Sequence, residues 1–148
     1  MGGWRAMGGL AAVVVLLAGC GARWPWASEA GETRLEGTKW QWVAGGSGGT
    51  PRAVEQPARY TIEFLPEYRL EVRADCNRAA GPWRTRDAAV TLGPFVVTRK
   101  TCAAASLSAE FLEGLEQARG WSVRDGALFL ELPERRGDLR FEAVAAKP

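Results

Sequence analysis

The chain has 148 residues, with 19 basic and 17 acidic side chains, a formal net charge of +2 and no histidine. This length suits one domain and a leader. The balance of charge shows no basic stripe and so predicts no nucleic-acid partner, and the lack of histidine excludes histidine-dependent catalytic triads.

The N-terminal segment has the pattern of an export signal. Arg5 is the only charged residue before Cys20, and an apolar run extends from Leu10 to Ala18. This run is about half as long as a transmembrane helix requires, whereas a short basic region followed by a short apolar one is typical of a secretory signal. We therefore expect residues 1–19 to be a signal peptide.

The signal ends in Leu17-Ala18-Gly19-Cys20, which resembles the lipobox of bacterial lipoproteins. The resemblance implies cleavage before Cys20 and attachment of diacylglyceryl and further acyl groups, such as palmitate, to that residue. Two or more acyl chains anchor a protein stably. We expect a lipid-anchored protein of the bacterial cell envelope. In a diderm organism we place it at the outer membrane facing the periplasm, because aspartate after the lipidated cysteine usually favours the inner membrane and this chain has Gly21 there. The alternative is an ordinary signal peptide with a chance cysteine.

Residues 20–34 are small, polar and unpatterned, which is typical of a flexible tether from a lipid to a domain. Trp24 and Trp26 within it either lie at the headgroup level of the bilayer or pack on the domain. We place the domain itself at residues 35–145.

The domain opens with a strand in which Trp40 and Trp42 alternate with polar residues, so both indoles should point to one face. Residues 44–58 are rich in glycine and proline and predict a long connection. We interpret this connection as a mobile insertion rather than a binding loop.

Apolar residues then occupy alternate positions from Tyr60 to Phe64 and from Tyr68 to Cys76, with charged residues between them. This pattern predicts an antiparallel hairpin with one apolar and one charged face, and its phase places Cys76 on the buried face. The outward positions include three carboxylates, Glu63, Glu71 and Asp75.

A further strand runs through Val90 and Leu92, is interrupted at Gly93-Pro94, and resumes at Phe95 with its phase shifted by one residue. Such a shift predicts a bend that helps a sheet to curl.

The next apolar residues, from Leu107 to Ala118, have the spacing of a helix. Ser106 or Ser108 should cap its N-terminus and Gly120 should end it. The opposite face carries three carboxylates, which we expect to be solvated and not to bind metal: Glu110, Glu113 and Glu116.

The last elements form a second hairpin and a final strand. Asp125-Gly126 is a strong two-residue turn signal, and it places Val123 opposite Leu128 and Trp121 opposite Leu130. Apolar residues then face one another, so turn and pattern agree. The final strand contains Leu139 and Phe141.

Cys76 and Cys102 remain once Cys20 is assigned to lipid. Paired thiols of exported proteins usually form disulfides, so we expect a structural bridge. It would close a loop of 27 residues, which corresponds to roughly 3.5 kcal/mol of stabilisation. Free thiols and redox or zinc chemistry are the alternatives. The spacing is unlike Cys-x-x-Cys, and two cysteines without histidine do not make a zinc site.

Several short motifs occur in a fixed order along the domain. They are Leu35-x-Gly37-Thr38-x-Trp40, Cys76-Asn77-Arg78-x-x-Gly81-x-Trp83, Thr98-Arg99-x-x-Cys102, Glu110 in the helix, Leu128-x-Leu130 and Leu139-x-Phe141. Together they resemble the META/HslJ family of small envelope proteins, often lipoproteins. The resemblance implies an α+β fold, mainly antiparallel β, with a curled sheet or partial β-barrel and one packed α-helix. It also implies links to envelope stress and antibiotic tolerance, and it supplies no catalytic residue or cofactor.

Among the motif residues, Asn77 and Gly81 are explained by a turn, because both tolerate a left-handed backbone. Arg99, next to Thr98, either binds an anion or partner or covers the sheet edge. Asp75 departs from the family pattern, which often has glycine before the Cys-Asn pair.

We expect a non-enzymatic, monomeric envelope domain without cofactor or metal, which acts in stress tolerance or envelope integrity through an unidentified protein partner. The alternative is a periplasmic inhibitor of lysozyme or proteases, or a small-ligand-binding module. An enzyme with paired carboxylates would need both groups in one cleft, and the outward positions on the first hairpin disfavour it.

Overall fold

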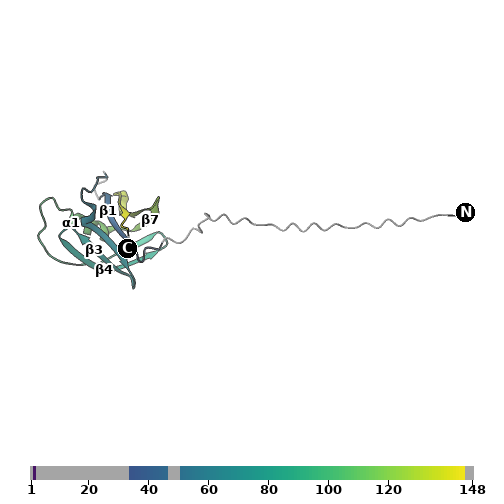
Figure 1. Cartoon of the computed structure of the whole chain (residues 1–148), viewed down its shortest axis with the longest axis horizontal. Coiled ribbons are helices and arrows are strands. Elements are labelled where there is room, and N and C mark those ends of the chain that lie inside the picture. The colour runs from purple at the N-terminus through teal and green to yellow at the C-terminus, as the bar shows by residue number, and fades with distance from the viewer. Residues whose placement is uncertain (1, 3–33, 47–50, 146–148) are drawn as a thin grey trace. The chain divides into compact units, whose positions relative to one another are not determined.

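The computed structural model describes residues 2, 34–46 and 51–145 (Figure 1). The predicted signal peptide, Cys20, the tether, Trp24 and Trp26 lie outside these ranges. In the described ranges, no helix has both the length and the apolar composition that a bilayer crossing requires.

The described residues form nine strands, one α-helix and two short 3-10 helices. The strands are β1 (Lys39–Gly45), β2 (Tyr60–Leu65), β3 (Arg69–Ala74), β4 (Asn77–Arg86), β5 (Ala89–Leu92), β6 (Val96–Val97), β7 (Gly120–Arg124), β8 (Ala127–Glu131) and β9 (Asp138–Ala143). The helix α1 spans Ser108–Gln117, and the 3-10 helices span Pro57–Arg59 and Pro133–Arg135.

The strands form one antiparallel sheet in the order β3-β2-β1-β9-β8-β7-β5-β4-β6. Because β3 also pairs with β4, eight strands close into a barrel and β6 extends beside β4. The predicted fold class, a curled sheet or partial barrel with one packed helix, is confirmed.

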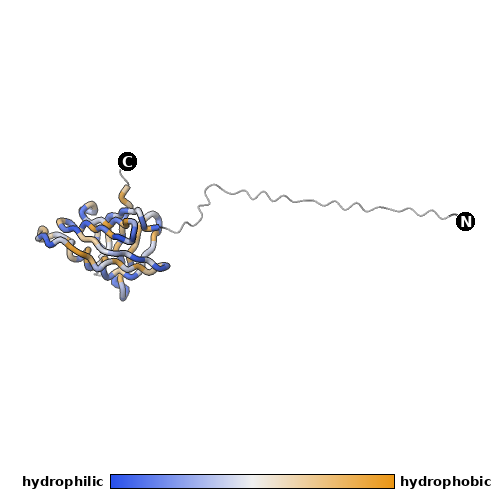
Figure 2. Tube along the Cα trace, turned by 90° about the horizontal axis from the view of Figure 1, so that it is seen from below, coloured by the Kyte–Doolittle hydropathy of each residue, from blue (hydrophilic) through white to orange (hydrophobic). Residues whose placement is uncertain are grey.

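Both predicted hairpins are present in the predicted phase. In the first, Phe64 faces Leu70 across β2 and β3. In the second, Trp121 faces Leu130 and Val123 faces Leu128. Buried and more exposed residues alternate along β2 and β3, so each of these strands turns one face to the core. Hydrophobic and hydrophilic segments are interspersed through the domain (Figure 2).

The helix packs into the core of the barrel through one apolar face. Phe111 and Leu115 are fully buried, and the Phe111 ring stacks on Trp42 with ring centroids 5.1 Å apart. Trp40 and Trp42 both point into this core, as predicted. The helix ends at Gln117, so the prediction that Gly120 ends it was wrong: Ala118 turns to an extended conformation and Gly120 begins β7.

Part of the 44–58 connection packs on the domain, contrary to the interpretation as a mobile insertion. Ala53 bridges to Ala44, and the backbone N–H of Val54 donates to the carbonyl of Val43 at 2.9 Å. The Val54 side chain is buried in the core. The apolar side chain, flanked by polar residues in the sequence, therefore anchors the segment.

Candidate functional site

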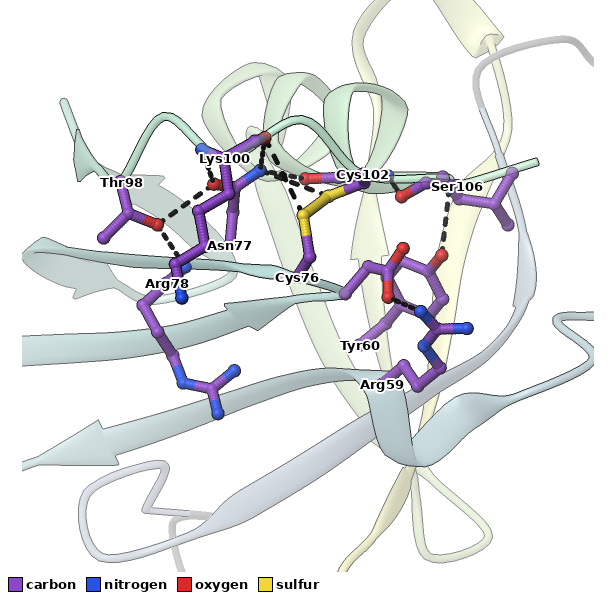
Figure 3. The surroundings of a disulfide bond; sticks show 12 residues. Arg59, Tyr60, Cys76, Asn77, Arg78, Thr98, Lys100, Cys102 and Ser106 are labelled. Atoms are coloured by element: carbon purple, nitrogen blue, oxygen red, sulfur yellow. Dashed lines mark hydrogen bonds and ion pairs between the residues drawn. A yellow bond between two sulfur atoms is a disulfide. The ribbon is translucent and has the colours of Figure 1, made fainter. Parts of the chain in front are cut away.

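Three of the motif residues, Asn77, Arg78 and Thr98, lie beside a disulfide between Cys76 and Cys102 (Figure 3). The bond joins the short connection between β3 and β4 to the segment between β6 and α1, with Cα atoms 5.6 Å apart. The strand phase predicted Cys76 on the buried face, whereas the residue is only half-buried. The phase is broken one residue earlier, at Asp75.

Asp75 adopts a left-handed backbone with φ of 59°. This conformation suits glycine best, but aspartate visits it more readily than most residues, which explains how Asp75 replaces the glycine common in the family. The turn ends β3 and directs the Asp75 side chain inward, where only 2% of it is exposed. The prediction that Asp75 lies on the outward, charged face was therefore wrong.

The buried carboxylate of Asp75 is paired with the Arg59 guanidinium, which is 40% exposed. The backbone carbonyl of Arg59 also accepts a hydrogen bond from the Asp75 N–H at 2.7 Å. The Oδ1 atom contacts the guanidinium but accepts no hydrogen bond of normal geometry within the described residues. The sequence pattern predicted the first hairpin without a register. In the structure Tyr60 pairs with Ala74, and the same register, extended by one residue, brings Arg59 opposite Asp75.

Asn77 makes the densest set of polar contacts at the site. Its Oδ1 accepts from the Lys100 N–H at 2.8 Å and from the Thr98 hydroxyl at 3.0 Å. Its Nδ2 donates to the Lys100 carbonyl at 3.2 Å and lies 3.4 Å from both Ser108 Oγ and Cys102 Sγ. A buried amide bonded on both its oxygen and its nitrogen holds the 98–108 segment against β4.

The interpretation of Asn77 and Gly81 as turn residues was wrong, because both lie within β4 and neither has a positive φ. Gly81 is required by close packing instead. A Cβ at this position would lie 2.5 Å from the Pro94 carbonyl oxygen and 2.8 Å from Cδ1 of Phe95. The bent segment after β5 therefore rests directly on the backbone of β4.

The remaining motif residues divide between the core and the surface. Trp40 is buried and its Nε1 donates to the Thr38 hydroxyl at 2.7 Å. Thr98 Oγ1 also accepts from the Arg78 N–H at 3.0 Å, which ties the end of β6 to β4. Arg99 is exposed and has no carboxylate partner within 4 Å in the described part of the chain.

A cavity of about 310 Å³ opens beside the disulfide on the Asp75 side. Its polar lining comes from the 51–60 segment, from the connection after β3 and from the loop before α1: Arg52, Glu55, Gln56, Arg59, Tyr60, Asp75 and Ser106. The Tyr60 hydroxyl accepts a hydrogen bond from the Leu107 N–H at 2.9 Å. This arrangement offers charged and hydroxyl groups for binding.

The other carboxylates considered in the sequence do not line this cavity, although Glu110 is paired with Arg52, which does. Glu63 is paired with Lys39 at 2.9 Å, and Glu71 lies 3.6 Å from Arg69. In the helix, Glu110 is half-buried and paired with Arg52, whereas Glu113 and Glu116 are exposed. No group of three or more candidate metal ligands occurs among the residues that the structure describes.

These features define a small antiparallel β-barrel domain with an inserted helix, in which motif residues fasten the segment before the helix. The chain belongs to the META family, because the META domain model matches residues 33–145. The family predicted from the motif order is thus confirmed.

Solved structures with the same fold include two from bacteria. An NMR structure of a protein from Burkholderia xenovorans is 22% identical, covers 76% of this chain and 85% of its own, and has a TM-score of 0.63. A crystal structure of a DUF4847 family protein from Bacteroides vulgatus is 12% identical, covers 76% of this chain and 96% of its own, and has a TM-score of 0.56. At these identities the likeness concerns the fold alone. Among curated proteins, none matches the chain.

Proposed function

We propose that the protein is a lipoprotein of the bacterial envelope, anchored through Cys20, whose META domain acts without catalysis. The domain would contribute to envelope integrity or stress tolerance by contacting another envelope protein. The anchor rests on the apolar run and the lipobox that follows it. Membership of the META family is consistent with such a role.

The non-catalytic part of the proposal rests on one observation: the polar groups of the motif are hydrogen-bonded to other groups of the domain. Asn77 and Thr98 are bonded to each other and to the backbone of Arg78 and Lys100. Catalytic groups must keep an open position for the reacting atoms. Side chains whose polar atoms are already hydrogen-bonded within the fold are better suited to a structural role than to catalysis.

The proposal is tested by crosslinking in intact cells, followed by capture of the protein from detergent-solubilised membranes. The Cys20→Ser form, exported without lipid, is the control. We expect a specific envelope protein to be recovered with the anchored form and to be depleted with Cys20→Ser. Recovery of the same proteins with both forms, or of none, would contradict a role through an anchored interaction.

A small-ligand-binding module is the second candidate, and the cavity beside Arg59 favours it. Concave sites with a few convergent polar groups are the usual place for small ligands. Screening of envelope extracts for compounds that raise the thermal midpoint of the protein, with Arg59→Ala for comparison, tests this function. A ligand of the cavity should stabilise the wild type and leave Arg59→Ala unchanged.

A further inference from the structure

Arginine gathers on one surface of the barrel. From residue 68 to residue 86 the chain has five arginines, no lysine and two carboxylates. Of these carboxylates, Asp75 is buried and Glu71 lies 3.6 Å from Arg69. By contrast, residues 101–145 have five arginines and eight carboxylates. We call the exposed side chains of β3 and β4 the basic face; its arginines are Arg69, Arg73, Arg78, Arg84 and Arg86.

Two arginines at the centre of the basic face lie directly opposite each other. Arg73 of β3 is paired in register with Arg78 of β4, and Figure 3 shows the Arg78 side chain pointing away from the Asn77 network. Neither has a carboxylate within 4 Å in the described ranges. Like charges facing each other across strands are unfavourable. An anionic partner would remove this repulsion.

Beside the basic face lie the large apolar side chains that are exposed in the described domain, Tyr68 just before β3 and Val96 in β6. Tyr68 is 54% exposed and Val96 is 82% exposed. Val96 pairs with Ala80 of β4, and the Arg84 guanidinium lies 4.9 Å from the centre of the Tyr68 ring. Basic side chains together with exposed apolar ones are the combination that binds the surface of an anionic bilayer.

We propose that the basic face docks on anionic phospholipid headgroups and so orients the domain on the membrane. Guanidinium groups bind phosphate in a bidentate manner, and Tyr68 and Val96 would enter the interfacial layer. The proposal rests on the proposed anchor at Cys20. The 14 residues of 21–34 extend to about 50 Å at most, which keeps the domain close to the surface. The sequence showed no basic stripe because the arginines alternate with apolar residues and gather only when β3 pairs with β4.

The test is binding of the full chain carrying Cys20→Ser to vesicles of phosphatidylglycerol and phosphatidylcholine in equal parts, and to vesicles of phosphatidylcholine alone. The substitution removes acylation, and the apolar leader is common to every variant. We expect binding to the anionic vesicles that weakens as salt is added. The double variant Arg73→Gln/Arg78→Gln should bind about 25-fold more weakly, at about fivefold per charge.

Two further variants test whether a change in vesicle binding arises from the basic face or from a general loss of positive charge. Arg135→Gln/Arg140→Gln removes the same charge from β9 and from the connection before it, across the barrel from β3 and β4, and should bind as the parent does. Glu71→Gln removes the exposed carboxylate of the basic face and should bind the anionic vesicles about fivefold more tightly, a change opposite in direction to that of Arg73→Gln/Arg78→Gln.

Equal binding to both kinds of vesicle, or equal losses in the two double variants, would overturn the proposal. Face-dependent capture of an acidic protein without vesicle binding would also overturn it and assign the basic face to a protein partner. Palmitate labelling of Cys20 is a separate measurement, so failure of the docking and failure of the anchor are distinguishable.

Discussion

The disulfide separates two polar regions that differ in kind. On one side, the buried Asn77 forms a neutral, part-buried network with the 98–108 segment. On the other side, Asp75 and Arg59 form an ion pair at the edge of a cavity. Because Asp75 and Asn77 are only two residues apart, the difference arises from the left-handed turn at Asp75, which directs the two side chains to different neighbours.

This comparison separates structural side chains from accessible ones. The network is bonded on both the oxygen and the nitrogen of Asn77, which rigidifies a buried site. The ion pair keeps one partner in contact with solvent, since Arg59 is 40% exposed. We therefore expect substitutions on the Asn77 side to alter stability alone. Substitutions on the Arg59 side should also alter the binding of a ligand in the cavity.

Removal of the disulfide between the two regions should have the largest effect on stability. We expect Cys76→Ser/Cys102→Ser to lower the free energy of unfolding by about 3.5 kcal/mol, because the unfolded chain loses a closed loop. Denaturant unfolding of the oxidised wild type and of the variant measures this difference. Wild type treated with reductant is the control and should match the variant. An equal stability of all three samples would contradict the role of the bond.

Asn77→Ala should cost about 2 kcal/mol, because it leaves the part-buried N–H and carbonyl of Lys100 without their partner. Thr85→Ala, an exposed polar change on the same strand, is the matched control and should be nearly neutral. Denaturant midpoints at constant slope measure both. If the two variants lose the same stability, Asn77 does not fasten the segment.

Arg59→Ala should cost about 2 kcal/mol, because the buried Asp75 carboxylate loses its cation. Asp75→Asn keeps the shape and the tolerance for a left-handed backbone while removing the charge, so it should cost less. Thermal and denaturant unfolding of both variants test the order. A larger loss for Asp75→Asn would mean that hydrogen bonding to the carboxylate, rather than its charge, governs this region.

The smallest effect concerns the backbone at Asp75. Asp75→Gly and Asp75→Ala remove the same ion pair, but only glycine adopts a φ of 59° without cost. We expect the glycine variant to be more stable than the alanine variant by about 1 kcal/mol. Two equal denaturant midpoints would show that the left-handed turn is not retained in solution.

Local patterns in the sequence predicted the parts of the fold that depend on neighbouring residues. The alternation around Trp40 and the turn at Asp125-Gly126 gave the correct faces and the correct register. The phase shift after Gly93-Pro94 was also correct, since Val96 is exposed while Phe95 and Val97 are half-buried.

Strand β4 was not predicted, because the residue types at its inward positions depend on contacts with residues distant in the sequence. The inward positions are Asn77, Ala79, Gly81 and Trp83, which do not make an apolar alternation. Gly81 makes room for Pro94, and Asn77 bonds to residues more than 20 positions away. The burial of Asp75 likewise follows from one backbone conformation that breaks the strand pattern.

The central claim, that the domain is held at a membrane through Cys20, is tested most directly by metabolic labelling with palmitate. Wild type and Cys20→Ala are compared in an expressing bacterium after separation of membrane and soluble fractions. The account predicts labelled wild type in the membrane fraction and unlabelled Cys20→Ala in the soluble exported fraction. Equal soluble export of both forms, without label on either, would contradict it.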